Sequence, residues 1–91
     1  MQTAQRLRLK REMAEEKPSV WIGKNGVTEE SIREISNQLE KNQVVKIKIQ
    51  RTIQNASSIR ELAQEIAGKT ASNLIDVRGR SFTLYKEKKR L

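Results

Sequence analysis

The sequence predicts an α/β fold with the element order α-β-α-β-α-β-β, in which a mixed four-stranded sheet packs against helices. Residues 45–49 alternate strictly between apolar and basic side chains, as strands with one buried face do. Apolar residues recur at helical spacing on both sides of this stretch. Two further alternating segments are separated only by Gly79 and Arg80, which is the spacing of a tight β-hairpin. With 91 residues, the chain is expected to form a single domain, 1–91.

The first half of the chain is expected to form a helix, a short strand and a second helix. Residues 4–16 favour helix, and Pro18 ends this helix because a helix rarely runs through the residue before a proline. The apolar run Val20–Ile22 is typical of a strand. Thr28 then stands at an N-cap position, and the helix that follows ends near Asn42. The apolar face of this second helix consists of Ile32, Ile35 and Leu39.

The second half is expected to form a strand, a third helix and the hairpin. After the alternating strand, Ser57 or Ser58 can cap a helix, and Gly68 is expected to end it in the left-handed conformation. The hairpin strands are residues 74–78 and 81–85. The strand-helix-strand connections imply parallel pairing through right-handed crossovers, and the hairpin adds an antiparallel strand.

The composition argues against catalysis. The sequence contains no cysteine, no histidine and a single aspartate, Asp76. Disulfides, thiolate metal sites and the commonest general bases are therefore excluded, and we expect neither a cofactor nor a metal nor enzymatic activity. The loop Gly23-Lys24-Asn25-Gly26 lacks the spacing and the Lys-Ser/Thr ending of a nucleotide-hydrolysing P-loop. No continuous apolar stretch could form a signal peptide or a membrane span, so we expect a cytoplasmic protein without a membrane or small-molecule partner.

The net charge of +8 is concentrated near the C-terminus. Residues 1–17 carry five basic and three acidic side chains, residues 18–77 carry eight and seven, and residues 78–91 carry six and one. A solvated surface explains charges of both signs but not this segregation, which indicates a polyanionic partner. The alternative is that the run from Lys86 to Arg90, which overlaps the basic tail 87–91, only improves solubility.

Nine residues are candidates for contacts with the phosphate groups of such a partner. Four form a GxxG loop between a strand and a helix N-terminus, where backbone N–H groups and the helix dipole attract phosphate, although a plain tight turn also explains the glycines. Two lysines project from one face of a strand, where they could equally serve solubility. The others are positively charged residues in the hairpin or just beyond it. Like charges that are held close together repel one another, and an anionic partner relieves this repulsion. The nine candidates are Gly23, Lys24, Asn25, Gly26, Lys46, Lys48, Arg78, Arg80 and Lys86.

The three aromatic residues favour recognition of phosphate and shape over base stacking. Phe82 shares its strand face with Leu84 and is expected in the core, while Tyr85 points the other way. Trp21, in the middle of a short apolar strand, is also expected in the core. Without an exposed aromatic platform, structured RNA is a better candidate partner than a single strand.

Three motifs resemble those of the CRM domain, an RNA-binding module. They are VWIGKNGVT at 20–28, VVKIK at 44–48 and GRSFTLYK at 79–86. The resemblance runs from about Lys17 to Lys86. It implies a fold similar to the C-terminal domain of bacterial translation initiation factor three, with the glycine loop as a KH-like GxxG element.

The resemblance also implies a function. Stand-alone members of the family act in ribosome assembly on the large-subunit precursor, whereas tandem members in plant organelles assist group II intron splicing. Because this chain has room for one copy, ribosomal RNA is the expected partner, and a monomer is the expected state. One difference from the family pattern is Thr70-Ala71-Ser72, where many members have a Thr-Gly-Gly-like turn before the third strand. A contact that the glycine backbone makes there in other members is therefore not expected to carry over directly to this sequence.

Two alternatives remain at this point. A DNA-coating dimer of the Alba type has a related fold and would bind generic duplex DNA with equal affinity. A protein-binding adaptor in translation would instead use the apolar surface near Trp21 and the N-terminal helix, expected within residues 1–17.

Overall fold

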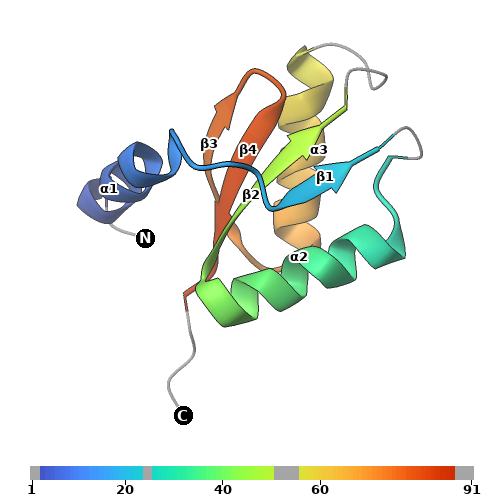
Figure 1. Cartoon of the computed structure of the whole chain (residues 1–91), viewed down its shortest axis with the longest axis horizontal. Helices are drawn as coiled ribbons and strands as arrows, with labels where there is room; N and C mark the ends of the chain where they lie inside the picture. Colours follow the sequence, from blue (N-terminus) through green and yellow to red (C-terminus); the bar gives the residue numbers. More distant parts are fainter. Residues whose placement is uncertain (1–2, 24–25, 51–55, 88–91) are drawn as a thin grey trace.

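The computed structural model describes residues 3–23, 26–50 and 56–87, and for 56–58 it describes the backbone alone. The predicted order α-β-α-β-α-β-β is confirmed (Figure 1). The elements are α1 (Thr3–Met13), β1 (Val20–Ile22), α2 (Glu29–Asn42), β2 (Val44–Ile49), α3 (Ala56–Lys69), β3 (Asn73–Arg78) and β4 (Ser81–Tyr85).

The four strands form one mixed sheet in the order β1-β2-β4-β3. β1 runs parallel to β2, with Val20 opposite Ile47, as the crossover through α2 requires. β4 is antiparallel to both of its neighbours, β2 and β3. The last strand of the chain therefore lies inside the sheet, where it joins β2 to β3. The sequence predicted the hairpin and the mixed sheet, but it did not predict this position of β4.

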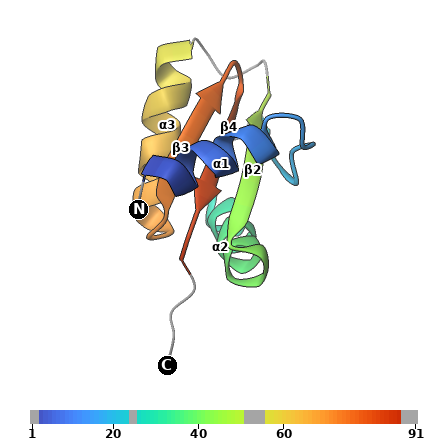
Figure 2. The same cartoon turned by 90° about the vertical axis from the view of Figure 1, so that its left-hand side faces the viewer.

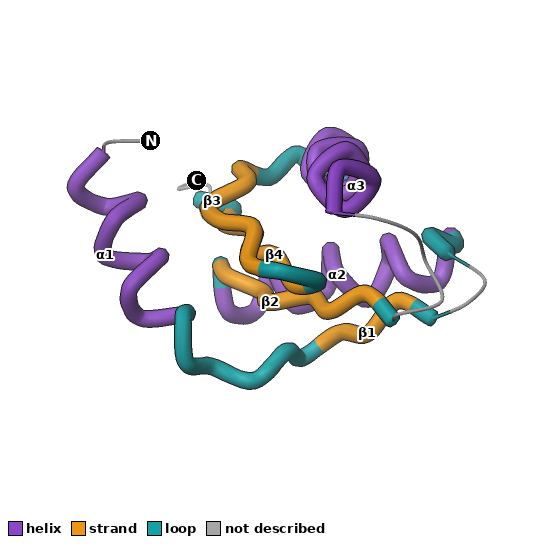
Figure 3. Tube along the Cα trace, turned by 90° about the horizontal axis from the view of Figure 1, so that it is seen from above, coloured by secondary structure: helices purple, strands orange, loops and turns teal. Residues whose placement is uncertain are grey.

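Helices α2 and α3 cover one face of the sheet, and α1 lies on the other, which we call the outer face (Figure 3). The main core fills the space between the sheet and the helices α2 and α3. Its strand residues are Val20, Ile22, Val45, Ile47, Ile49, Phe82 and Leu84, and its helix residues are Ile35, Leu39, Ile59, Ala63, Ile66 and Ala67.

The alternation of side chains along the strands explains which residues enter this core. In β2 the side chains of Val45, Ile47 and Ile49 are buried, and those of Lys46 and Lys48 lie on the outer face, as predicted. Phe82 is 1% exposed, which confirms its predicted place in the core. The prediction for Trp21 is wrong, because its side chain is 56% exposed. Both of its neighbours in β1 point into the core, and the twofold period of a strand therefore turns Trp21 outward.

Helix α2 has a defined cap at each end. The Oγ1 of Thr28 accepts a hydrogen bond from the backbone N–H of Ser31 at 3.1 Å, which confirms the predicted N-cap. At the other end Gln43 adopts a left-handed φ of 67°, and its N–H donates to the carbonyl of Leu39 at 2.9 Å. This ending turns the chain back sharply, so that β2 begins at the next residue.

The predicted end of the third helix at Gly68 is wrong. α3 continues through Gly68 to Lys69, and the residue in the left-handed region is Ala71, with φ 53°. The Oγ1 of buried Thr70 donates to the carbonyl of Ile66 at 2.8 Å and ties the turn to the helix. A residue with a Cβ costs about 1–2 kcal/mol in this conformation, so the turn is held by its hydrogen bonds rather than by glycine.

The hairpin has the two-residue turn that the sequence predicted. Gly79 occupies it with a positive φ of 55°, which suits a residue without a Cβ. The sequence did not predict the irregularity between Leu74 and Asp76, where the register of β3 against β4 shifts. Ile75, the residue within this irregularity, lies in a second, smaller cluster with Leu9 of α1. α1 is thus anchored on the outer face by a feature of β3.

Candidate nucleic-acid interface

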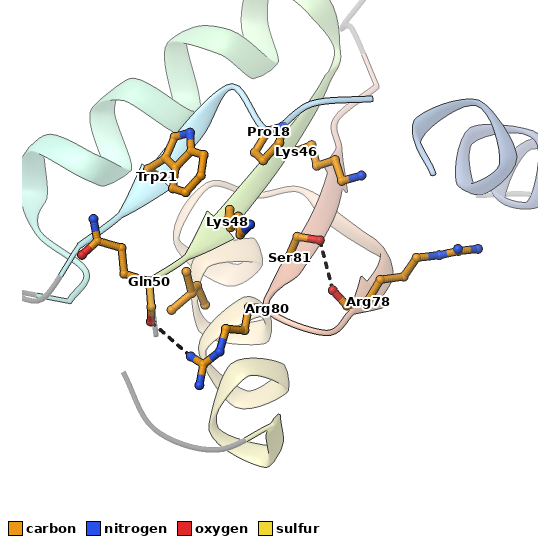
Figure 4. A pocket seen from close by; sticks show the side chains of 9 residues that line it. Pro18, Trp21, Lys46, Lys48, Gln50, Arg78, Arg80 and Ser81 are labelled. Carbon is orange, nitrogen blue, oxygen red and sulfur yellow. Dashed lines mark hydrogen bonds between the residues drawn. The ribbon is translucent and has the colours of Figure 1, made fainter. Parts of the chain in front are cut away.

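A shallow hollow lies on the outer face beside α1, with a volume of about 700 Å³ (Figure 4). Strands β1, β2 and β4, the end of β3 and the hairpin turn supply its lining. Among the residues that the structure describes, four basic side chains and no acidic one line it. The lining residues are Pro18, Trp21, Lys46, Lys48, Ile49, Gln50, Arg78, Arg80 and Ser81.

Trp21 and Lys48 form a pair across two neighbouring strands. The two residues are opposite each other in the register of β1 and β2, and the Lys48 Nζ lies 5.2 Å from the centroid of the indole ring. Such a contact at an exposed site stabilises by only about 0.5–1 kcal/mol, so a ligand can displace it easily. Sequence reasoning missed Trp21 as a site residue, although the buried-exposed-buried period of a three-residue strand was a usable signal.

Lys46 has a different role from Lys48, although both lie on the outer face of β2. Its Nζ donates to the carbonyl oxygens of Met13 at 3.0 Å, Ala14 at 3.2 Å and Glu16 at 2.9 Å. These carbonyls lie at and just beyond the end of α1, where the helix leaves acceptors without partners and where a positive charge is favourable. Lys46 therefore holds the end of α1 against the sheet, and all three of its donors are used.

α1 covers the part of the outer face formed by β3, β4 and the start of β2 (Figure 2). Leu9 is buried there against Ile75 and Tyr85. The Nε2 of Gln5 donates to the Tyr85 hydroxyl at 3.0 Å, and the Lys10 Nζ lies 3.7 Å from a carboxylate oxygen of Asp76. The Nη2 of Arg6 also donates to the carbonyl of Leu74 at 2.9 Å. The sequence predicted a helix over 4–16, but α1 ends at Met13.

We expect the substitution Lys46→Met to loosen α1 and leave the sheet folded. An isolated helix of this length is marginal in water, so loss of three charge-assisted bonds should cost about 2 kcal/mol of docking. Amide hydrogen exchange in α1, followed by NMR, should then become about 30-fold faster. The matched control is Lys48→Met, which removes the next outward lysine of β2. Equal exchange in the two variants would show that Lys46 does not hold α1.

The two arginines of the hairpin lie at one end of the sheet, which we call the hairpin end. It is the end at which β1 and β2 finish and the β3–β4 turn lies (Figure 1). The Nε of Arg78 lies 2.9 Å from the Oδ2 of Asp76, so its charge is partly balanced. The Nη1 of Arg80 donates to the carbonyl of Gln50 at 3.1 Å, at the end of β2. In Figure 4 the Arg80 side chain points toward the Gln50 carbonyl, whereas Arg78 extends away from Trp21.

The GxxG loop follows β1 at the same hairpin end. The N–H of Gly26 donates to the carbonyl of Gly23 at 2.9 Å, and Gly26 has a positive φ of 73°, which explains a glycine there as a turn residue. The side chain of Gln50 lies beside Gly23 and links the loop to the hollow. Lys24 and Asn25 lie outside the described residues.

Lys86 is not brought together with the hairpin arginines. Its backbone N–H donates to the carbonyl of Gln43 at 2.8 Å, at the end of the sheet where β2 begins and β4 finishes. The length of β4 therefore separates Lys86 from Arg78 and Arg80, and the turn holds only the two arginines together. The basic tail beyond residue 87 lies outside the described residues.

The described part of the chain contains no group of three histidine, cysteine, aspartate or glutamate side chains that could hold a metal ion. Within the same ranges, no helix has the length and apolar character needed to cross a membrane. The arrangement is one that can bind: an exposed aromatic ring and cations around a shallow hollow, with a glycine turn beside it.

Comparison with known proteins finds a matching family model and similar solved structures. The family model of the CRS1/YhbY (CRM) domain matches residues 1–86. The solution structure of the hypothetical protein SAV1595 from Staphylococcus aureus, described as a candidate RNA-binding protein, is 30% identical and superposes with a TM-score of 0.80. That match covers 99% of this chain and 93% of the other. No curated protein sequence matches significantly. From its sequence and its fold, the chain belongs to the CRS1/YhbY (CRM) domain family.

Proposed function

We propose that this protein binds structured RNA, and that its partner is ribosomal RNA of the large-subunit precursor during ribosome assembly. The observation that carries the proposal is the hollow at the hairpin end of the sheet, which gathers basic side chains around an exposed ring beside a glycine turn. Phosphate groups supply the negative charge that such a surface attracts, and they position a protein on nucleic acid. Membership of the CRM family and the solved candidate RNA-binding relative support the same function.

The geometry selects among the nine predicted contacts. Lys48 and Arg80 line the hollow and are proposed to meet the RNA backbone there, with Arg78 at its edge. The loop of residues 23–26 would extend this contact surface along the hairpin end. We leave Lys46 out, because its ammonium group holds α1. Lys86 is at the other end of β4 and would contribute only to a larger footprint.

The proposed role is binding without catalysis. No histidine or cysteine is present in the sequence, so the RNA would be held or shaped rather than cut. We propose that the domain acts as a monomer in the cytoplasm and stabilises an intermediate of assembly. The preference for ribosomal RNA rests on the resemblance to CRM-domain proteins that act on the ribosome, and the binding experiment below tests it.

The first test is binding of the protein to fragments of large-subunit ribosomal RNA and to duplex DNA of equal length. The loop variant carries Lys24→Glu and Asn25→Glu. The sequence offers a matched control, because Lys41 and Asn42 are the same pair at the end of α2, away from the hairpin end. We expect the RNA to be preferred, the loop variant to lose this preference, and the variant with Lys41→Glu and Asn42→Glu to keep it.

Other results would point elsewhere. Equal affinity for RNA and duplex DNA together with dimer formation in solution would favour a DNA-coating protein. If the folded loop variant bound RNA like the original, the glycine loop would be only a turn and the RNA contacts would lie elsewhere. Circular dichroism of both variants shows whether the fold is retained.

A further inference from the structure

We infer that the hollow takes one unpaired RNA base, which stacks on Trp21 while its phosphate is held by Lys48 and Arg80. This inference rests on the proposed function and specifies the class of RNA. The ligand would be folded RNA with an unpaired nucleotide in a loop or a bulge, rather than an uninterrupted duplex.

The first support is the exposure of Trp21 itself. Its side chain is 56% exposed in the middle of β1, on the part of the sheet that α1 leaves uncovered. Among the main packing contacts of the described chain, β1 meets β2 and α2, and α1 is not among them. The flat indole ring therefore presents apolar surface to solvent, and every base has a π-face that can stack on such a ring.

The second support is the chemistry around the ring. The hollow of about 700 Å³ has the size of sites that hold small ligands, which run from about 300 to 1,000 Å³. Lys48 and Arg80 contribute positive charge on the side where a nucleotide phosphate would lie. Gln50 adds a side-chain amide, which can both donate to and accept from the edge of a base. Figure 4 shows Lys48 in the middle of this group, with Trp21, Gln50 and Arg80 around it.

The present position of Lys48 does not oppose the inference. Its ammonium group lies over the indole ring at 5.2 Å from the centroid, and the side chain is exposed. A lysine side chain is long and flexible, so the ammonium can move from the ring to a phosphate when a base arrives. The indole ring would then stack on the base in place of its contact with the Lys48 ammonium group.

The geometry of RNA makes the inference selective. In an uninterrupted A-form helix the bases are stacked on one another, and the major groove is too deep and narrow for side chains to read. The indole ring of Trp21 lies on the open surface of the sheet and cannot reach a base inside such a helix. An unpaired base in a loop can turn outward and stack, so Trp21 should distinguish the two kinds of RNA.

Trp21 is the single tryptophan of the sequence, so its fluorescence reports on this site alone. We would measure emission and affinity with an RNA hairpin that carries unpaired loop bases and with a fully paired RNA duplex of equal charge. The variants are Trp21→Ala, Trp21→Phe and the control Leu7→Ala, which removes an apolar side chain of similar exposure, 54%, from α1.

We expect the hairpin RNA, but not the duplex, to quench the fluorescence. Trp21→Ala should weaken binding of the hairpin about 5- to 150-fold and leave duplex binding unchanged. Trp21→Phe should keep most of the affinity, and Leu7→Ala should keep all of it. Equal loss for both RNAs, or no quenching, would overturn the stacking site while RNA binding by the original chain would still support the proposed function. Failure of the original chain to bind either RNA would overturn both.

Discussion

Raising the salt concentration from about 50 to about 200 mM is expected to weaken binding to ribosomal RNA by about three decades. Each phosphate that meets a lysine or arginine releases condensed counterions, and about six such contacts give a loss of this size. The net charge of +8 and the basic lining of the hollow provide cations for these contacts. Titrations of a labelled RNA fragment across a salt series measure the slope directly.

The control for this prediction is a variant that combines Lys48→Gln with Arg80→Gln. Removal of two cations from the hollow should reduce the slope by about two contacts. A slope that is shallow in the original chain would contradict extensive phosphate contact. A steep slope that the variant leaves unchanged would place the contacts outside the hollow.

The substitution Phe82→Ala is expected to lower the free energy of unfolding by about 3–5 kcal/mol. Phe82 is 1% exposed in the interior strand β4, where it lies opposite Ile47 on one side and Val77 on the other. Truncation removes contacts with both neighbouring strands and leaves a cavity that the surrounding close-packed side chains cannot fill. A domain of this size has only about 5–14 kcal/mol of stability, so the loss is a large share. Urea denaturation measures it.

Leu7→Ala is the reference for this experiment, because the Leu7 side chain is 54% exposed and its truncation should change stability by less than about 0.5 kcal/mol. A loss of less than about 1 kcal/mol for Phe82→Ala would mean that the core around β4 is loosely packed. The slope of the denaturation curve should be unchanged in both variants, since neither alters the surface exposed on unfolding appreciably.

The sequence predicted those parts of the fold that local patterns determine. The alternation over 45–49 identified β2, Gly79 and Arg80 located the turn, and Thr28 located the start of α2. In each case the periodicity or the cap depends on residues that are close in the sequence. The end of α3 was mispredicted because Gly68 offered a glycine, whereas the left-handed turn formed at Ala71 and was held by a threonine hydroxyl.

The candidate site was less predictable, because it depends on contacts between residues distant in the sequence. Lys46 and Lys48 have the same pattern in β2, yet only the docked position of α1 gives Lys46 its three carbonyl partners. Trp21 was assigned to the core by its apolar character, although the period of β1 turns it to the outer face. The apolar side chain favoured burial, but the alternation of side chains along the strand exposes it.

The interior position of β4 has a consequence for how the protein is made. Among the described strands, β3 is hydrogen-bonded to β4 alone, and β2 lacks its second neighbour until β4 is in place. During synthesis, the edges of β2 and β3 that pair with β4 therefore stay unpaired until Ser81–Tyr85 has emerged from the ribosome. The pairings that then form, such as Val44 with Tyr85, join distant parts of the chain, which is the slow kind of folding step. A nascent chain that stalls before β4 would expose strand edges prone to aggregation.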